Sequence, residues 1–264
     1  MGYRRQSYYK QVKDQDRHIQ TEEQIRLLVC RERKLLPKVG GRKLYWLLQD
    51  EFHQQGIACG RDKLFMVLRH NGLLIKPRKR YIQTTMSRHW MRRYPNLFKE
   101  QKPSAPEQVW VSDITYVKTT EGYCYLSLIT DAYSRKIVGY NVSDSLEAVN
   151  ARQALQMAVR SRRTQNSLIH HSDRGYQYCS SEYVSFAIQH NIRMSMTEHS
   201  DPYENALAER MNRTLKEEFG LGLELPSKHL ATLAVEQAVK LYNTYRPHLA
   251  LNGMTPQMVH KNPQ

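Results

Sequence analysis

The sequence has few cysteines, no long apolar run and no opening segment of the kind that directs export. No stretch approaches the roughly 18–20 apolar residues that a helix needs to span a bilayer. The four cysteines form no Cys-x-x-Cys pair, and His170, His171 and Cys179, which are close in sequence, have no second pair at zinc-finger spacing. We therefore expect a cytoplasmic protein with free thiols, no membrane span and no zinc site.

Acidic residues are scarce in the first hundred positions. Residues 1–100 hold 23 Lys and Arg against nine Asp and Glu, whereas residues 101–264 hold 17 against 16. In a chain with a formal net charge of +15, this distribution predicts a basic region that binds a polyanion and a near-neutral region with a separate task. Charge alone leaves DNA, RNA and an anionic membrane surface open.

Residues 21–93 have a helical pattern. Three segments with helical apolar spacing resemble a helix-turn-helix module over about residues 21–75, and a basic extension follows. A plain helical bundle with a solvated charged face would show the same spacing. The ten Lys and Arg from Arg61 to Arg93, against one acid, favour DNA contact. The candidate contacts are Lys76, Arg78, Lys79 and Arg80.

A change in composition separates two predicted domains. The segment QKPSAPEQ, residues 101–108, contains two prolines and no periodicity, and it coincides with the change in charge. We therefore predict a basic helical DNA-binding domain at 1–100, a linker at 101–108 and a second domain at 109–264 that ends in a helix and tail.

The second domain alternates between strand and helix patterns. Three β-rich runs, residues 109–118, 123–132 and 135–143, predict an antiparallel meander. A helix, a strand, a helix, a strand and a helix are then expected at 145–163, 167–173, 181–191, 192–197 and 201–218. This order predicts an α/β domain with a mixed five-stranded sheet covered on both faces, as in the RNase H-like fold.

Two aspartates stand where strand patterns disfavour them. Asp113 interrupts the apolar run VWVSDITYV, and the alternation of a strand places it on the face opposite Trp110 and Ile114. Asp173 directly follows the buried run LIHH, at the strand end where open α/β sheets place their ligands. Each also has an ordinary explanation, since Asp113 could pair with an arginine and Asp173 could serve a turn.

Four glutamates lie in residues 201–218, in an otherwise basic protein. Glu204 suits a capping box behind Asp201, and Glu217 and Glu218 suit an exposed last turn. Glu209 lies beside the apolar arc of the helix, on a stripe of amides and cations formed by Asn205, Asn212, Arg213 and Lys216. Helix geometry alone leaves Glu209 open between a functional carboxylate and a surface partner of Arg213.

The spacing of these acids resembles that of a known enzyme family. Fifty-nine residues separate Asp113 from Asp173, and thirty-five separate Asp173 from Glu209. Four blocks of sequence accompany this spacing, in the order VWVSDITYV, HHSDRGYQYCS, DPYENALAERMNRTLKEE and YNTYRPHLALNGMTP. Together, the spacing and the blocks resemble those of the DDE recombinases, which include retroviral integrases. The closer resemblance is to OrfB transposases of the insertion-sequence-three family. Many members have Asp-Asn-Ala where this chain has Glu204-Asn205-Ala206, and the His-His-Cys-Cys zinc module of retroviral integrases is missing.

The resemblance implies a metal-dependent transposase. It implies that Asp113, Asp173 and Glu209 are the catalytic residues and that they bind two divalent ions, Mg²⁺ or Mn²⁺. It also implies the reaction, in which the enzyme cleaves the ends of the element and joins their 3′-OH groups to target DNA. Lys216 is the expected phosphate contact, with Arg213 and Asn205 as further candidates, and His171 and Arg174 could touch DNA or serve packing and a turn. The implied partners are terminal inverted repeats, target DNA, further copies of the chain and an upstream OrfA product, and the implied place is the nucleoid.

Two other functions share parts of this pattern. An RNase H-like nuclease without strand transfer would carry the same acids. A non-catalytic helix-turn-helix regulator would explain the basic region but not three spaced carboxylates.

Overall fold

The computed structural model describes residues 5–75, 93–99, 102–198 and 205–263. The chain divides into two compact units, Met1–Lys79 and Arg80–Gln264. The predicted linker at 101–108 lies within the second unit, and its Glu107 is buried there. A pattern of prolines and polar residues indicates a loop, but it does not tell whether that loop is packed.

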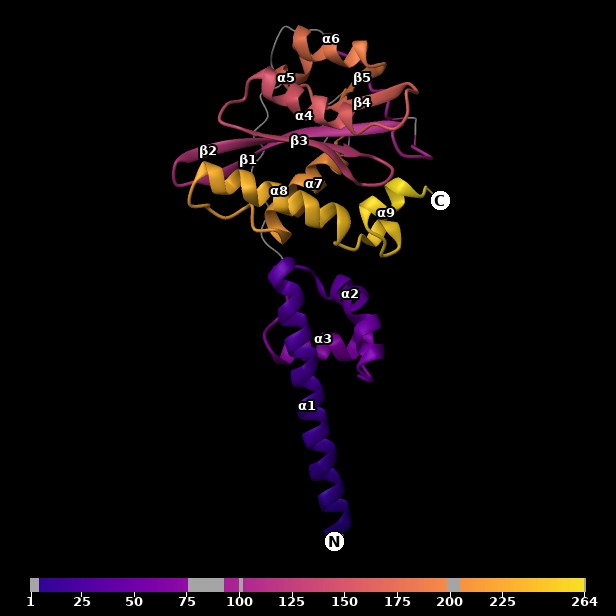
Figure 1. The fold of residues 1–264 in the computed structure, drawn as a ribbon, viewed down its shortest axis with the longest axis vertical. Coiled ribbons are helices and arrows are strands. Elements are labelled where there is room, and N and C mark those ends of the chain that lie inside the picture. Colours follow the sequence, from indigo (N-terminus) through magenta and orange to yellow (C-terminus); the bar gives the residue numbers. More distant parts are fainter. Residues whose placement is uncertain (1–4, 76–92, 100–101, 199–204, 264) are drawn as a thin grey trace. The chain divides into compact units, whose positions relative to one another are not determined.

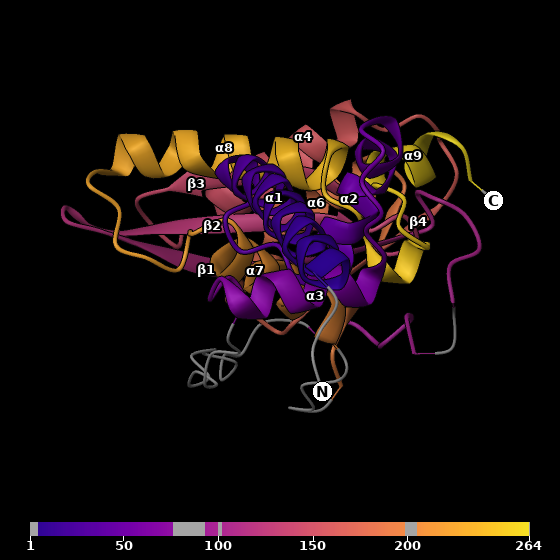
Figure 2. The ribbon, with the colours of Figure 1, turned by 90° about the horizontal axis from the view of Figure 1, so that it is seen from below.

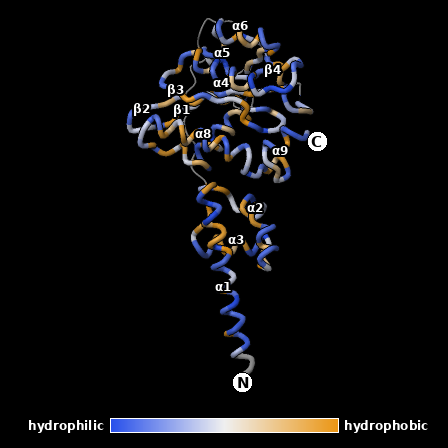
Figure 3. The backbone as a smooth tube through the Cα atoms, in the orientation of Figure 1, coloured by the Kyte–Doolittle hydropathy of each residue, from blue (hydrophilic) through white to orange (hydrophobic). Residues whose placement is uncertain are grey.

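The first unit is helical, as predicted. It consists of α1 (Arg5–Leu35), α2 (Gly41–Gln54) and α3 (Arg61–His70), which pack around apolar side chains such as Ile25, Leu44 and Leu64. Helix α1 extends far before the expected start near residue 21, and its first half is largely hydrophilic (Figure 3).

Glycines end two of these helices. Gly56 and Gly72 follow α2 and α3 with φ of 65° and 64°. Each is followed by a residue whose N–H reaches back to the last turn, Ile57 to the carbonyl of Phe52 at 2.8 Å and Leu73 to that of Leu68 at 2.7 Å. These bonds form Schellman caps, which need the left-handed backbone that glycine adopts without strain.

The second unit is built on a five-stranded mixed sheet in the order β3-β2-β1-β4-β5. The strands are β1 (Val109–Thr119), β2 (Gly122–Asp131), β3 (Ile137–Ser143), β4 (Leu168–Ser172) and β5 (Ile192–Met196). Strands β1, β2 and β3 are antiparallel neighbours that lie side by side in Figure 2, and β4 and β5 join β1 in parallel. The predicted fold class is confirmed.

Helices cover both faces of the sheet (Figure 1). One layer consists of α4 (Ala148–Arg160), α5 (Tyr176–Cys179) and α6 (Ser181–Gln189), and the other of α7 (Ala206–Glu218) and α8 (Lys228–Thr244). The short η1 (Leu249–Leu251) and α9 (Pro256–Lys261) follow. Alternation along β1 separates the two cores, since Trp110 packs with α4 and α6 while Val117 packs with α7 and α8.

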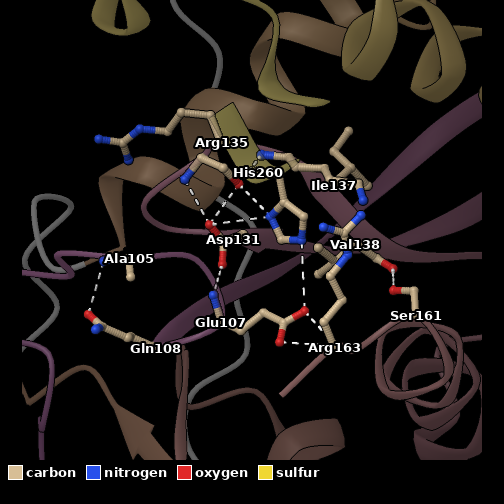
Figure 4. Close-up of polar contacts among 12 residues, drawn as sticks. Ala105, Glu107, Gln108, Asp131, Arg135, Ile137, Val138, Ser161, Arg163 and His260 are labelled. Carbon is tan, nitrogen blue, oxygen red and sulfur yellow. Dashed lines mark hydrogen bonds and ion pairs between the residues drawn. The ribbon is translucent and has the colours of Figure 1, made fainter. Parts of the chain in front are cut away.

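A buried polar network joins α9 to the sheet (Figure 4). His260 Nδ1 lies 2.9 Å from Ser134 Oγ, whose hydroxyl also donates to Asp131 Oδ1 at 2.7 Å. The backbone N–H of Glu107 donates to the other oxygen of Asp131 at 2.7 Å, and the Glu107 carboxylate accepts the N–H of Arg163. The network satisfies these buried acids and anchors the C-terminal end of the described chain to the sheet.

Candidate active site

The sheet register brings Asp113 and Asp173 together. Strands β1 and β4 run parallel, and their last pair is Ser112 with Ser172. Each aspartate is the next residue, so both carboxylates stand where the two parallel strands separate. This is the strand end at which open α/β sheets place their ligands, as predicted for Asp173.

Helix α7 carries Glu209 across the same edge. The helix packs on β1 through Ala208, Met211 and Leu215. Asn212, one turn after Glu209, donates from Nδ2 to Asp113 Oδ2 at 2.7 Å. The bond places Asp113 on the face covered by α7, opposite Trp110, as strand alternation predicts.

The three acids act on one another electrostatically. Burial and then the charge of Asp173 raise the pKa of Asp113 to about 7, with a smaller contribution from Glu209. Hydrogen bonds from Asn212 and from the N–H of Ile114 oppose this shift. Burial, followed by the charge of Asp173, also raises the pKa of Glu209. Such mutual shifts arise where like charges share a small, partly desolvated volume.

Two amides support this arrangement, and sequence reasoning assigned neither of them this role. Asn212 appeared only as a member of the stripe, yet it holds an oxygen of Asp113. Asn205, predicted to touch DNA, is buried and donates from Nδ2 to the carbonyl of Ser112 at 3.1 Å, which fixes the start of α7 on β1. The Oδ1 atoms of both amides are buried without a hydrogen-bond partner among the described residues.

The cations of α7 lie at different depths. Lys216 is partly buried, with Nζ 4.1 Å from the ring centroid of Tyr116, and burial lowers its pKa while the charge of Asp113 acts in the opposite sense. Arg213 is exposed and pairs with Glu217 at 3.1 Å. Lys216 is therefore the cation of α7 that belongs to the acidic site.

His171 and Arg174 are engaged in packing. His171 is buried, with Nδ1 2.9 Å from Ser195 Oγ and its ring 5.4 Å from that of Phe98. Arg174 donates from Nε to the carbonyl of Thr197 at 2.6 Å and also bonds the carbonyl of Glu198. Of the two roles considered for these residues, the observed contacts are those of packing and a turn.

Glu218 is not a simple surface charge. Arg246 donates two hydrogen bonds of 2.7 Å to the Glu218 carboxylate. The side chain of Arg246 is 5% exposed and that of Glu218 is 21% exposed. Sequence reasoning missed this pair because the partners lie 28 residues apart and on different elements.

Several predicted residues lie outside the described residues. They are the DNA contacts Lys76, Arg78, Lys79 and Arg80, and the capping residues Asp201 and Glu204. Their roles stay predictions.

The donor set suits a hard divalent cation. Carboxylate oxygens are the side-chain ligands that Mg²⁺ prefers, and unpaired buried amide oxygens lie beside them. No group of three or more His, Cys, Asp or Glu close enough to hold an ion occurs among the described residues. In the same part of the chain, no helix is long and apolar enough to cross a membrane.

Comparison with known proteins shows the family of the chain. Two models of the integrase core domain match residues 103–202 and 190–256. A 31 kDa insertion element IS600 protein of Shigella sonnei is 34% identical over 97% of this chain and 94% of its own length. The transposase InsF of insertion sequence IS3A from Escherichia coli K12 is 34% identical over 80% of this chain and 74% of its own.

A solved structure shows the same fold. The simian T-cell lymphotropic virus intasome, in complex with a PP2A regulatory subunit, contains a chain that matches with a TM-score of 0.53 at 18% identity, covering 86% of this chain and 72% of that one. With the sequence relatives, this likeness agrees with the resemblance noted in the sequence. The chain belongs to the integrase-core family of insertion-sequence transposases, enzymes of DNA transposition.

Proposed function

We propose that this chain cleaves the ends of an insertion sequence and joins their 3′-OH groups to target DNA, using Asp113, Asp173 and Glu209. The observation that carries the proposal is geometric: Asp113 and Asp173 follow paired residues of two parallel strands, and Glu209 stands one turn before Asn212, which bonds Asp113. In agreement with this placement, the charges of Asp173 and Glu209 both raise the pKa of Asp113, a shift that a bound cation would offset.

The proposed cofactor is a pair of divalent ions, Mg²⁺ or Mn²⁺. Asp113 would contact both ions, and Asp173 and Glu209 one each. When bound, such a pair activates the attacking oxygen and neutralises the leaving oxygen of a phosphodiester. Asn212 keeps one oxygen of Asp113 in place, and Lys216 would bind a phosphate of the DNA strand, a role that its partial burial beside the acidic site supports.

Each chemical step exchanges one phosphorus–oxygen bond for another. In the first, water attacks the phosphorus at the element end, a new P–O bond forms and the 3′-oxygen leaves as a 3′-OH. In the second, that 3′-OH attacks a phosphodiester of the target, and the target's own 3′-oxygen leaves. No covalent enzyme intermediate is required in either step.

The proposed partners are the terminal inverted repeats of the element and the target DNA. Two ends must be held together for joining, so a homo-oligomer is proposed, with an OrfA product as a further partner or fusion. The basic extension at Lys76, Arg78, Lys79 and Arg80, at the boundary between the two units, would bind DNA together with the first unit. Replacing these four by Ala should flatten the dependence of DNA affinity on salt, because each lost phosphate contact reduces the slope by about 0.9. An unchanged slope would place the DNA surface elsewhere.

Glutamine substitutions on one helix test the catalytic assignment. Glu209→Gln should abolish both end cleavage and strand transfer of a labelled element-end duplex in Mg²⁺, whereas Glu217→Gln, two turns later, should retain them. Asp113→Asn should be inactive in the same assay while it still binds the duplex. Full strand transfer by Asp113→Asn would refute the assignment. Cleavage without joining by the wild-type chain would indicate a nuclease, and binding without cleavage a regulator.

A further inference from the structure

Two tyrosines form an exposed aromatic surface near the acids. Tyr116 on β1 and Tyr123 on β2 are 40% and 50% exposed. Their rings meet edge to face, with centroids 5.4 Å apart and an interplanar angle of 82°. Tyr116 is the third residue after Asp113 on β1, about 10 Å along the strand, and strand alternation places its side chain on the opposite face from Asp113. Rings held rigidly on strands lose little conformational entropy when they stack on a ligand.

Lys216 connects this surface to the catalytic helix. Its ammonium lies 4.1 Å from the centroid of the Tyr116 ring, and the charge of Asp113 acts on it. The Lys216 ammonium therefore contacts the Tyr116 ring and also lies close enough to Asp113 for its charge to act on it. It would therefore bind a phosphate one or a few nucleotides away from the phosphate that reacts.

The edge of β1 beside these residues is open. Strand β4 pairs with β1 only over Val109–Ser112, and the next contact on that side is the bridge between Thr119 and Leu225. Between these two points no strand of the described residues pairs with this edge of β1. Lys216 of α7 contacts the Tyr116 ring and is affected by the charge of Asp113, so its ammonium links these two residues, whose side chains lie on opposite faces of β1.

We propose that Tyr123 stacks on an unpaired nucleobase of the DNA strand whose phosphate Lys216 binds, and that Tyr116, which meets Tyr123 edge to face, holds this ring in place. The proposal rests on the proposed function and adds a base-binding site to it. Stacking accepts any base, so the site would hold the frayed end of the DNA without reading its sequence. The rise along β1 from Asp113 to Tyr116 is about the length of three stacked nucleotides, so the three terminal positions of the strand are the ones to test.

The test is a binding measurement that needs no chemistry. The full chain is titrated, without divalent metal, into an element-end duplex whose three terminal nucleotides are unpaired and carry 2-aminopurine at one position. For the wild-type chain we expect quenching of the fluorescence at one of the three positions. Tyr123→Ala should remove the quenching and weaken binding about 5- to 100-fold, the range for loss of one base–aromatic stack. Tyr123→Phe keeps the ring and should behave as the wild type within about two-fold.

A second comparison separates stacking from a structural effect. With an abasic nucleotide at the quenched position, wild type and Tyr123→Ala should bind equally, because the base that distinguishes them is missing. The same pattern is expected for Tyr116→Ala against Tyr116→Phe. Equal quenching by wild type and both alanine variants would overturn the proposal, as would an alanine effect that persists on abasic DNA. Failure of the proposed function would appear differently, as cleavage and joining that survive Glu209→Gln.

Discussion

Asp113→Asn should stabilise the metal-free protein while it removes activity. Burial and the neighbouring acids raise the pKa of Asp113 from 3.8 to about 7. Each pKa unit corresponds to about 1.4 kcal/mol, so ionisation of Asp113 in the folded state lowers the free energy of unfolding by up to about 4 kcal/mol above neutral pH. Because the side chain is only partly buried and water can relax around it, we expect a gain of about 2–4 kcal/mol for the amide. The new NH2 would replace the oxygen that accepts from Asn212, and a turn of the Asn212 amide would let its Oδ1, which has no hydrogen-bond partner among the described residues, accept from it instead.

The pH dependence has a definite sign. The folded-state pKa of Asp113 lies above its unfolded value, so between about pH 4 and 7 the folded state holds the proton more tightly. The wild type is therefore stabilised by protonated Asp113 at low pH and loses this part of its free energy of unfolding as pH rises through that window. The loss is complete above the folded-state pKa. The advantage of Asp113→Asn should be near zero at pH 4, should grow toward pH 7 and should be constant beyond it.

Urea unfolding in EDTA, at several pH values, measures this difference. Adding Mg²⁺ should then stabilise the wild type and leave Asp113→Asn nearly unchanged, because bound cation acts only on the state that binds it. A variant that is less stable than the wild type at pH 8 in EDTA would refute the reasoning. So would a difference in unfolding free energy that does not vary between pH 4 and 7.

Three further predictions concern groups around the sheet. Asn212→Ala removes the bond to Asp113 that favours its charged form, so about 10- to 100-fold more Mg²⁺ should be needed for half-maximal cleavage, measured by metal titration. Glu218→Gln leaves the nearly buried Arg246 without its charged partner and should lower the free energy of unfolding by about 2–4 kcal/mol in urea, against little change for an exposed glutamate. Burial lowers the pKa of His170 to about 3, so the wild type should lose stability as pH falls from about 6.5 toward 3. In thermal melts at several pH values, the melting temperature of His170→Phe should not show the part of this decrease that comes from protonation of His170.

Local patterns in the sequence sufficed for most elements. The alternation of VWVSDITYV predicts a strand with Asp113 opposite Trp110, and the structure confirms both. Glycines after α2 and α3 end those helices through short-range backbone bonds. The long first half of α1 was missed because its polar residues lack the apolar spacing by which helices are recognised.

Contacts between distant segments could not be predicted in the same way. The pairing of Glu218 with Arg246 and the bond from Asn212 to Asp113 join residues 28 and 99 positions apart. Asn205 was predicted at the DNA surface, but it is buried at the start of α7, where it donates to the backbone of β1. A helical wheel indicates which residues share a stripe, whereas the depth of the stripe depends on what the helix packs against.

The sequence by itself determined the order of strands and helices and the spacing of Asp113, Asp173 and Glu209, because both are properties of the linear chain. It also identified the family, through four ordered blocks. Only the tertiary structure decided that Asp113 and Asp173 follow paired residues of two parallel strands, and that Asn212 and Lys216 reach the same edge. The register of β1 with β4 and the seating of α7 on β1 produce this meeting, and both depend on packing between segments that lie far apart along the chain.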